Sequence, residues 1–98
     1  MKYDDSGLRR GFKPGFCVFP SYKYCGPGCS GPGVPLNEVD AACKEHDECY
    51  LTTRNYCLCD EQFIYRLSYL QNPYTIEGRH ARTMLRYMKI QRFFTCGF

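Results

Sequence analysis

The sequence predicts a small, mainly α-helical domain that is cross-linked by disulfide bonds. Its 98 residues suit one domain with a modest core, and chains of this length often need cross-links or a metal. Eight residues are cysteine, an even number at irregular spacing, which is typical of a disulfide framework. A segment rich in glycine and proline precedes three segments that have the apolar periodicity of helices.

The glycine- and proline-rich segment, residues 14–35, is expected to be an ordered loop. It contains five prolines and five glycines, a density that excludes a regular helix. Three cysteines, Cys17, Cys25 and Cys29, are placed to fix its course.

The first helix is predicted over residues 38–53. Asn37 is a favourable N-cap, and acidic residues follow it in the first turn. One helical face then repeats every three or four residues until the break at TTRNY. The residues of this face are Val39, Ala42, Cys43, His46, Tyr50 and Thr53.

Two further helices are predicted over residues 57–71 and 76–91. The earlier one stops before Pro73, because proline disfavours helical backbone in the preceding residue. Its inner face holds Asp60, Phe63, Ile64, Leu67 and Leu70. The later one has an apolar stripe of Ala81, Met84, Leu85 and Met88, and a basic stripe of Arg79, Arg82, Arg86 and Lys89.

The connection between the first two helices is short, so they are expected to be antiparallel neighbours. If the turn centres near residue 54, Cys49 faces Cys59 across the pair. The same register brings His46 and Asp60 to a similar height, with the carboxylate in reach of the ring.

Charge is distributed unevenly along the chain. The net charge of +3 combines +3 over residues 1–36, −5 over residues 37–61 and +5 over residues 62–98. An acidic centre suits a cation, and basic flanks suit an anionic surface.

The acidic centre contains residue types that suit ester hydrolysis beside a cation. A neutral His46 can act as a general base near pH 7, and a buried Asp60 behind it would fix the tautomer. Asp47 points beside the ring and offers a carboxylate. Calcium prefers several oxygens, and Gly26 and Gly28 let the loop turn its carbonyls inward.

Three segments resemble secreted phospholipase A2, in that family's order. DAACKEHDECY contains the active-site pattern Cys-x-x-His-Asp-x-Cys-Tyr, YCGPG the calcium-loop pattern Tyr-x-Gly-x-Gly, and CLCD the paired aspartate. The resemblance covers about residues 24–64. The short connection between the helices resembles the compact bacterial and fungal forms and the phospholipase domain of parvovirus capsids.

The resemblance implies a phospholipase A2-like fold and calcium-dependent hydrolysis of the sn-2 acyl ester of glycerophospholipids. His46 matches the base that activates water, Asp60 the aspartate that orients it, and Tyr50 the tyrosine that bonds to this aspartate.

The resemblance also implies Ca²⁺ as the cofactor. Asp47 matches the carboxylate ligand, and Tyr24, Gly26 and Gly28 match the positions whose backbone carbonyls bind the ion. The Gly26 N–H would help to stabilise the oxyanion.

Two disulfides follow from the same resemblance, Cys25–Cys43 and Cys49–Cys59. The remaining cysteines, Cys17, Cys29, Cys57 and Cys96, allow three pairings. The chain departs from the animal pattern at Ala42, where the family has a tandem cysteine, and its N-terminal interfacial helix is not recognisable in residues 1–16.

The expected partner is a phospholipid membrane or micelle surface, and no nucleic acid is expected. No run approaches the length of a membrane span, and the start, MKYDDSGLRRGF, has no apolar region of a signal peptide. With the cysteines, the resemblance implies a secreted or otherwise extracytoplasmic protein.

Two other functions compete with the enzyme. A non-catalytic membrane-binding or toxin-like module could use the same scaffold, but the intact His46, Asp47 and Asp60 favour catalysis. A zinc-held module is disfavoured, because no two cysteine pairs have the spacing of a zinc finger or ribbon.

Some residues receive simpler interpretations. His80 is interpreted as an exposed helix residue without a role. The basic stripe is interpreted as a solvated face in preference to a membrane-binding surface. Part of an apolar set near the loop is expected to line the cleft or touch lipid. This set is Phe12, Phe16, Val18, Phe19 and Tyr22.

Overall fold

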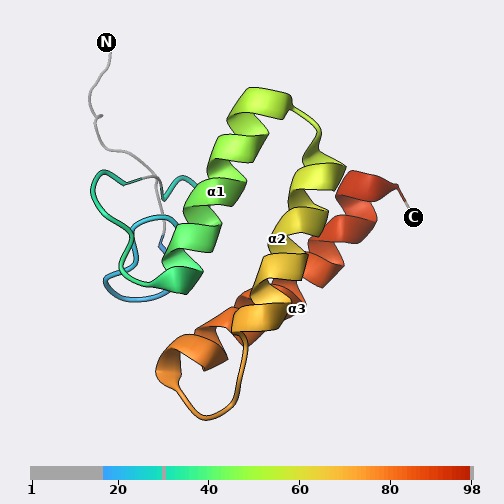
Figure 1. The fold of residues 1–98 in the computed structure, drawn as a ribbon. Coiled ribbons are helices and arrows are strands. Elements are labelled where there is room, and N and C mark those ends of the chain that lie inside the picture. The colour runs from blue at the N-terminus through green and yellow to red at the C-terminus, as the bar shows by residue number, and fades with distance from the viewer. Residues whose placement is uncertain (1–16, 30, 98) are drawn as a thin grey trace.

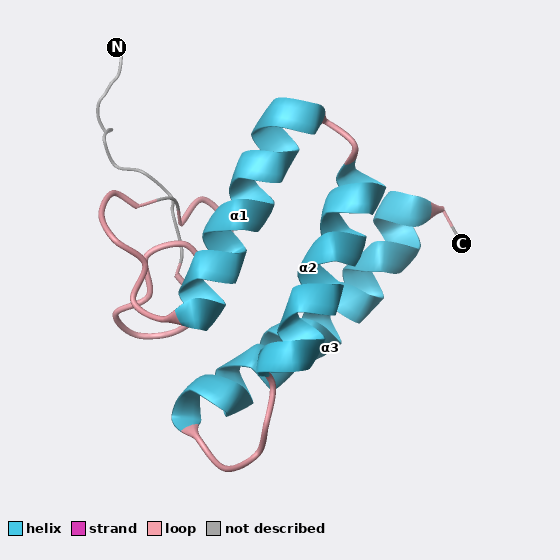
Figure 2. Ribbon diagram, viewed as in Figure 1, coloured by secondary structure: helices cyan, strands magenta, loops and turns pink. Residues whose placement is uncertain are grey.

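Three helices and one long loop make up the protein (Figure 1). The computed structural model describes residues 17–29 and 31–97. The helices are α1 (Glu38–Thr53), α2 (Tyr56–Leu70) and α3 (Ile76–Cys96), and the described ranges contain no strand (Figure 2). The predicted mainly α fold is therefore confirmed, including its disulfides and its third helix.

The helix boundaries follow from capping residues. The Asn37 side chain accepts from the Asp40 N–H, and α1 ends at Arg54, which is left-handed with φ 58°. Asn55 caps α2 by accepting from the Leu58 N–H. The predicted range 38–53 is confirmed, and α2 starts and ends one residue before its predicted range.

The third helix is longer than predicted. Thr75 caps it by accepting from the Gly78 N–H, and it continues beyond residue 91 to Cys96, where Gly97 takes the left-handed cap. The buried apolar stripe of Ala81, Met84 and Met88 does not continue with apolar residues into this added turn, so the predicted helix stopped short of it. This turn carries Thr95, which contacts Asp60 at the candidate site.

The helix α2 lies between the other two and contacts both, whereas α1 and α3 barely touch. The short link makes α1 and α2 antiparallel, as predicted (Figure 1). The core between them is apolar apart from two fully buried carboxylates, Asp40 and Asp60. Its largest fully buried apolar side chains are Leu67, Met88 and Val39.

All eight cysteines form disulfides, so the zinc-held alternative is excluded. The two bridges implied by the resemblance are present. The four cysteines whose pairing the sequence left open form two further bridges. The bridges are Cys25–Cys43, Cys49–Cys59, Cys17–Cys29 and Cys57–Cys96. The last closes 39 residues and ties the start of α2 to the end of α3, which contributes about 4 kcal/mol by loop-closure entropy.

Some expectations fall on residues that the structure does not describe. These are the irregular segment 1–16 and the placement of Phe12 and Phe16 beside the loop. Within the described ranges, no helix has the length and apolar character to cross a bilayer.

Candidate active site

His46 on α1 and Asp60 on α2 meet as the antiparallel register predicts. The His46 Nε2 lies 2.7 Å from the Asp60 Oδ1, and their side chains are 12% and 0% exposed. The imidazole ring lies between two aromatic rings, 4.4 Å from Tyr50 and 4.5 Å from Phe63 by ring centroids. The ring is therefore held in one orientation by packing and by a hydrogen bond.

The protonation states of the pair define a base. Burial lowers the pKa of His46, against the opposing effect of Asp60, so the ring is neutral at pH 7. Burial alone would raise the pKa of Asp60, but hydrogen bonds from its neighbours outweigh this effect and lower it. An ionised Asp60 only accepts, so Nε2 carries the proton and the Nδ1 lone pair is left to accept one.

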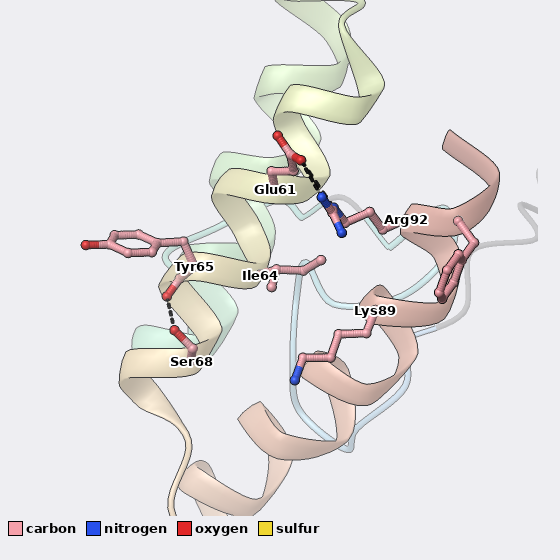
Figure 3. A pocket seen from close by; sticks show the side chains of 7 residues that line it. Glu61, Ile64, Tyr65, Ser68, Lys89 and Arg92 are labelled. Atoms are coloured by element: carbon pink, nitrogen blue, oxygen red, sulfur yellow. Dashed lines mark hydrogen bonds and ion pairs between the residues drawn. The ribbon is translucent and has the colours of Figure 1, made fainter. Parts of the chain in front are cut away.

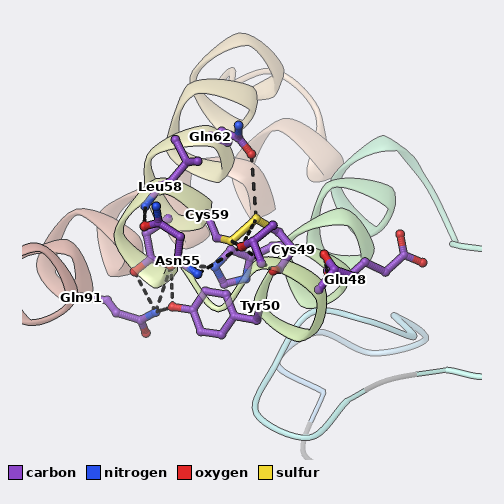
Figure 4. The surroundings of a disulfide bond; sticks show 12 residues. Glu48, Cys49, Tyr50, Asn55, Leu58, Cys59, Gln62 and Gln91 are labelled. Atoms are coloured by element: carbon purple, nitrogen blue, oxygen red, sulfur yellow. Dashed lines mark hydrogen bonds and ion pairs between the residues drawn. A yellow bond between two sulfur atoms is a disulfide. The ribbon is translucent and has the colours of Figure 1, made fainter.

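Four side chains converge on the Asp60 carboxylate. Besides His46, the Tyr50 hydroxyl donates to Oδ1 at 2.6 Å and the Thr95 hydroxyl to Oδ2 at 2.6 Å. The Gln91 amide lies 3.3 Å from Oδ2 and 3.1 Å from the Tyr50 hydroxyl. Figure 4 shows Gln91 reaching Tyr50 beside the Cys49–Cys59 bridge. These donors offset the cost of burying the charge.

Gln91 and Thr95 are the site residues that sequence reasoning missed. Both belong to α3, and the predicted helix ended at residue 91. The signal was present: the spacing of Ala81, Met84 and Met88 continues without a break to Gln91 and Thr95. Polar residues that continue a buried stripe indicate a buried polar partner, here Asp60.

Asp40 is a further residue whose importance the sequence did not reveal. It is fully buried, and its carboxylate accepts from three backbone N–H groups, those of Lys23 and Leu36 at 2.9 Å and of Tyr24 at 2.8 Å. With the Cys25–Cys43 bridge, it anchors the loop against α1. It lies seven residues before Asp47, two turns earlier on the same helical face.

Asp47 is the residue that a cation would satisfy best. Its partly buried carboxylate has no hydrogen-bond or ion-pair partner among the described residues. Burial, together with the charges of Glu48 and Asp40, raises its pKa to about 7. An acid left without a partner in this way fits a metal ligand, because a bound cation would supply the missing charge.

The predicted loop ligands lie in the segment that Asp40 and the Cys25–Cys43 bridge anchor to α1, and Cys43 is one helical turn before Asp47. Gly26 and Gly28 have φ of 135° and 72°, which L side chains rarely adopt. The Tyr24 hydroxyl donates to the Gly33 carbonyl at 2.6 Å, which closes the loop on itself. The Gly26 carbonyl accepts from the Cys29 N–H at 3.0 Å and keeps a second lone pair for a cation. The donor set of carbonyls and a carboxylate suits calcium.

A small hollow and a larger one lie beside the described helices, and the candidate base lines the smaller one. It occupies about 50 Å³ between α1 and α2, and its lining is Ala42, Glu45, His46, Cys49, Cys59, Gln62, Phe63 and Arg66. The larger, of about 620 Å³, lies between α2 and α3 and is drawn in Figure 3. His46 is the predicted site residue that lines the smaller hollow, whereas the lining of the larger includes neither His46 nor Asp60.

His80 is not a simple exposed residue. It stacks on Phe19 with ring centroids 4.0 Å apart, and its Nδ1 lies 2.9 Å from the Tyr22 hydroxyl. These contacts tie α3 to the loop. Phe19 and Tyr22, expected to line the cleft, are instead buried in the core, whereas Val18 is 38% exposed.

Comparison with known proteins identifies the same family as the sequence motifs. The family model described as Phospholipase A2-like domain matches residues 16–88 of the sequence. This range includes the loop, α1, α2 and the first half of α3.

Individual relatives match shorter stretches. The chain is 47% identical over 36 residues to basic phospholipase A2 nigroxin A of Micrurus nigrocinctus, covering 37% of this chain and 29% of the relative. The same identity and length hold for the acidic phospholipase A2 homolog taipoxin gamma chain of Oxyuranus scutellatus scutellatus, with 37% and 22% covered.

A viral protein matches more closely over its aligned stretch. Capsid protein VP1 of canine parvovirus type 2 is 56% identical over 43 residues, which cover 43% of this chain and 5% of the capsid protein. The chain thus spans less than a third of each of these relatives. No solved structure matches the chain.

Proposed function

The chain belongs to the phospholipase A2-like domain family, and from this premise we propose that it hydrolyses the sn-2 acyl ester of glycerophospholipids with calcium. The products are a fatty acid and a lysophospholipid. One observation carries the proposal: a neutral His46 is held by Asp60 with its Nδ1 available, and the following residue, Asp47, has no partner among the described residues.

The reaction starts with a proton transfer to His46. Nδ1 takes a proton from water, and the water oxygen attacks the carbonyl carbon of the sn-2 ester. Asp60 stabilises the imidazolium that forms, because its carboxylate is ionised and held by Tyr50 and Thr95. The imidazolium then protonates the departing glycerol oxygen, so the base is regenerated and the ester is converted to an acid and an alcohol.

Calcium completes the site in this proposal. Asp47 and the carbonyls of Tyr24, Gly26 and Gly28 would hold it, and it would supply positive charge to the ester carbonyl oxygen. The Gly26 N–H supports the same oxygen. Asp40 acts at a distance, because it keeps the loop against the α1 turn that precedes Asp47.

The working environment follows from the same proposal. The substrate is presented by a membrane or micelle surface, which is the expected partner. Four disulfides persist in an oxidising compartment, so a secreted or otherwise extracytoplasmic location is supported.

A vesicle assay with lipids labelled in the sn-2 chain tests the proposal. Wild-type protein should release the labelled fatty acid with calcium present, and a chelator should abolish the release. His46→Ala should lose about 10³-fold or more of the rate, while circular dichroism shows an intact fold. Glu48→Gln, next to Asp47 and exposed, is the matched control and should retain activity.

Two results would refute the proposal. Release that is undiminished in a chelator would remove the metal role, and near-normal turnover by His46→Ala would remove the base. The non-catalytic alternative predicts no turnover by any variant. It needs weighing, because one relative is itself named a phospholipase A2 homolog.

A further inference from the structure

The solvent-facing side of α3 combines exposed apolar and cationic side chains. Tyr87, Ile90 and Phe94 are 55%, 61% and 82% exposed. Their spacing of three and four residues aligns them along one stripe of the helix. A contiguous apolar stripe on a surface helix is a sign of an interaction site.

A cationic stripe runs beside the apolar one. It holds Arg79, Arg82, Arg86 and Lys89, and none of these forms an ion pair with an acid in the described ranges. The next cation on α3 behaves differently, since Arg92 pairs with Glu61 at 2.8 Å. Figure 3 shows Arg92 turned to Glu61, whereas Lys89 extends from α3 in another direction.

The charge of α3 is strongly one-sided. It contains five cationic residues and one acidic residue, Glu77, which lies in its first turn. The middle and end of the helix therefore present only positive charge. Such a face is complementary to an anionic surface, and it disfavours a second copy of the same face because like charges would meet.

The apolar stripe borders the side of α3 that reaches the site. Gln91, whose amide contacts Tyr50 and Asp60, lies between Tyr87 and Phe94, one turn from each. A surface that covers Tyr87 and Phe94 therefore lies beside the edge of α3 from which Gln91 reaches Tyr50 and Asp60.

We propose that α3 is a docking helix for anionic phospholipid surfaces. Its docking face consists of the apolar residues Tyr87, Ile90 and Phe94 and the cations Arg79, Arg82, Arg86 and Lys89. The aromatic and aliphatic side chains enter the headgroup layer, and the cations bind lipid phosphates. That the bound lipid is also the substrate rests on the proposed function, but the binding itself does not.

Each cation near an anionic bilayer contributes about fivefold to membrane affinity. Arg86→Gln should therefore weaken binding about fivefold, and Arg82→Gln with Arg86→Gln on the order of twentyfold. Phe94→Ala should weaken it on the order of tenfold, because the ring no longer leaves water. Lys44→Gln, an equal charge loss on α1, is the matched control and should change binding by less than about twofold.

The test is sedimentation with vesicles, using full-length His46→Ala protein in a chelator so that no turnover is needed. The expected result is binding to vesicles of phosphatidylglycerol and phosphatidylcholine, much weaker binding to phosphatidylcholine alone, and the losses above for each variant. Equal binding to both vesicles, or α3 variants that bind like their parent, would overturn the proposal. So would a concentration-dependent dimer that Phe94→Ala dissociates while vesicle binding is unchanged.

A second arm separates the two proposals. In the wild-type background, the α3 variants should slow hydrolysis of vesicles but not of a monomeric short-chain phospholipid. If no lipid is hydrolysed and vesicle binding still depends on α3, the proposed function fails and the docking face stands. If monomeric lipid is hydrolysed and vesicle binding ignores α3, only the docking face fails.

Discussion

The two aspartates of the site, Asp60 and Asp47, are treated in opposite ways by the fold. Asp60 is fully buried and accepts from His46, Tyr50 and Thr95, so its pKa is lowered. Asp47 is half-buried without a partner in the described ranges, and its pKa is raised to about 7. The charge of Asp60 is compensated by hydrogen-bond donors of the protein. The charge of Asp47 has no such donor in the described ranges, so a bound cation would compensate it.

In the proposed function, this difference divides the site into a base half, which contains Asp60, and a cation half, which contains Asp47. The base half is assembled from three helices and is preorganised before any ligand binds. The cation half consists of one unsatisfied carboxylate and a loop that Asp40 and a disulfide press against α1. Variants of the two aspartates should therefore have opposite effects on stability and separable effects on function.

The largest effect is expected from Asp60→Asn. The amide no longer accepts from every donor around it and no longer fixes the His46 tautomer, so kcat should fall on the order of 10³-fold. The free energy of unfolding should fall on the order of 3 kcal/mol, because buried donors lose their ionised acceptor. Steady-state kinetics and urea denaturation measure the two losses. A variant with normal kcat would show that Asp60 does not orient the base.

A smaller effect is expected from Thr95→Val, which removes one donor to Asp60 at nearly constant shape. We expect kcat to fall about tenfold with KM unchanged, and Thr95→Ser to restore it. The matched control is Thr83→Val, which changes an exposed threonine of α3 whose hydroxyl donates to the Arg79 carbonyl and has no other partner among the described residues. Equal losses at both positions would mean that the effect is on the helix rather than on Asp60.

Asp47→Asn should raise the stability of the calcium-free protein. Removing an unpaired, half-buried charge relieves its desolvation, so the Tm in a chelator should rise by roughly 2–5 °C at pH 8. Glu48→Gln removes the same charge next door and should not raise the Tm, since it breaks the ion pair with Lys44. A lower Tm for Asp47→Asn would indicate a protein partner for this carboxylate.

The pH dependence of these stability changes should be opposite in sign. Asp60 has a lowered pKa, so the stability it contributes is complete above its ordinary value of 3.8 and is lost as the pH falls through the lower folded value. Asp47 has a raised pKa, so its penalty is absent below 3.8, grows up to about pH 7 and is constant above it. Denaturation of both variants between pH 3 and pH 8 checks this, and parallel profiles would contradict it.

Sequence alone predicted most of this architecture. Capping by Asn37 and the α1–α2 register predicted that His46 lies opposite Asp60, and the structure has this contact. These features are local, because they depend on helical periodicity and a short turn. The two bridges implied by the family resemblance are also present.

What the sequence did not predict depends on contacts between distant segments. Gln91 and Thr95 reach Asp60 from more than 30 residues away, and their meaning depends on how α3 packs. Asp40 looked like a favourable residue of the first turn, yet it is the buried acceptor for the loop. His80 on α3 contacts Phe19 and Tyr22, which belong to the loop before α1 and are far from it in the sequence. A local pattern carries no information about such partners.

A calorimetric titration with calcium tests the separation of the two halves most directly. At pH 7, Asp60→Asn should bind calcium within about twofold of the wild-type Kd although its turnover is lost, because the two carboxylates share no hydrogen-bond partner among the described residues. Asp47→Asn should show no calcium binding in the same range. Calcium affinity that is lost in Asp60→Asn, or retained in Asp47→Asn, would contradict the division of the site into a base half and a cation half.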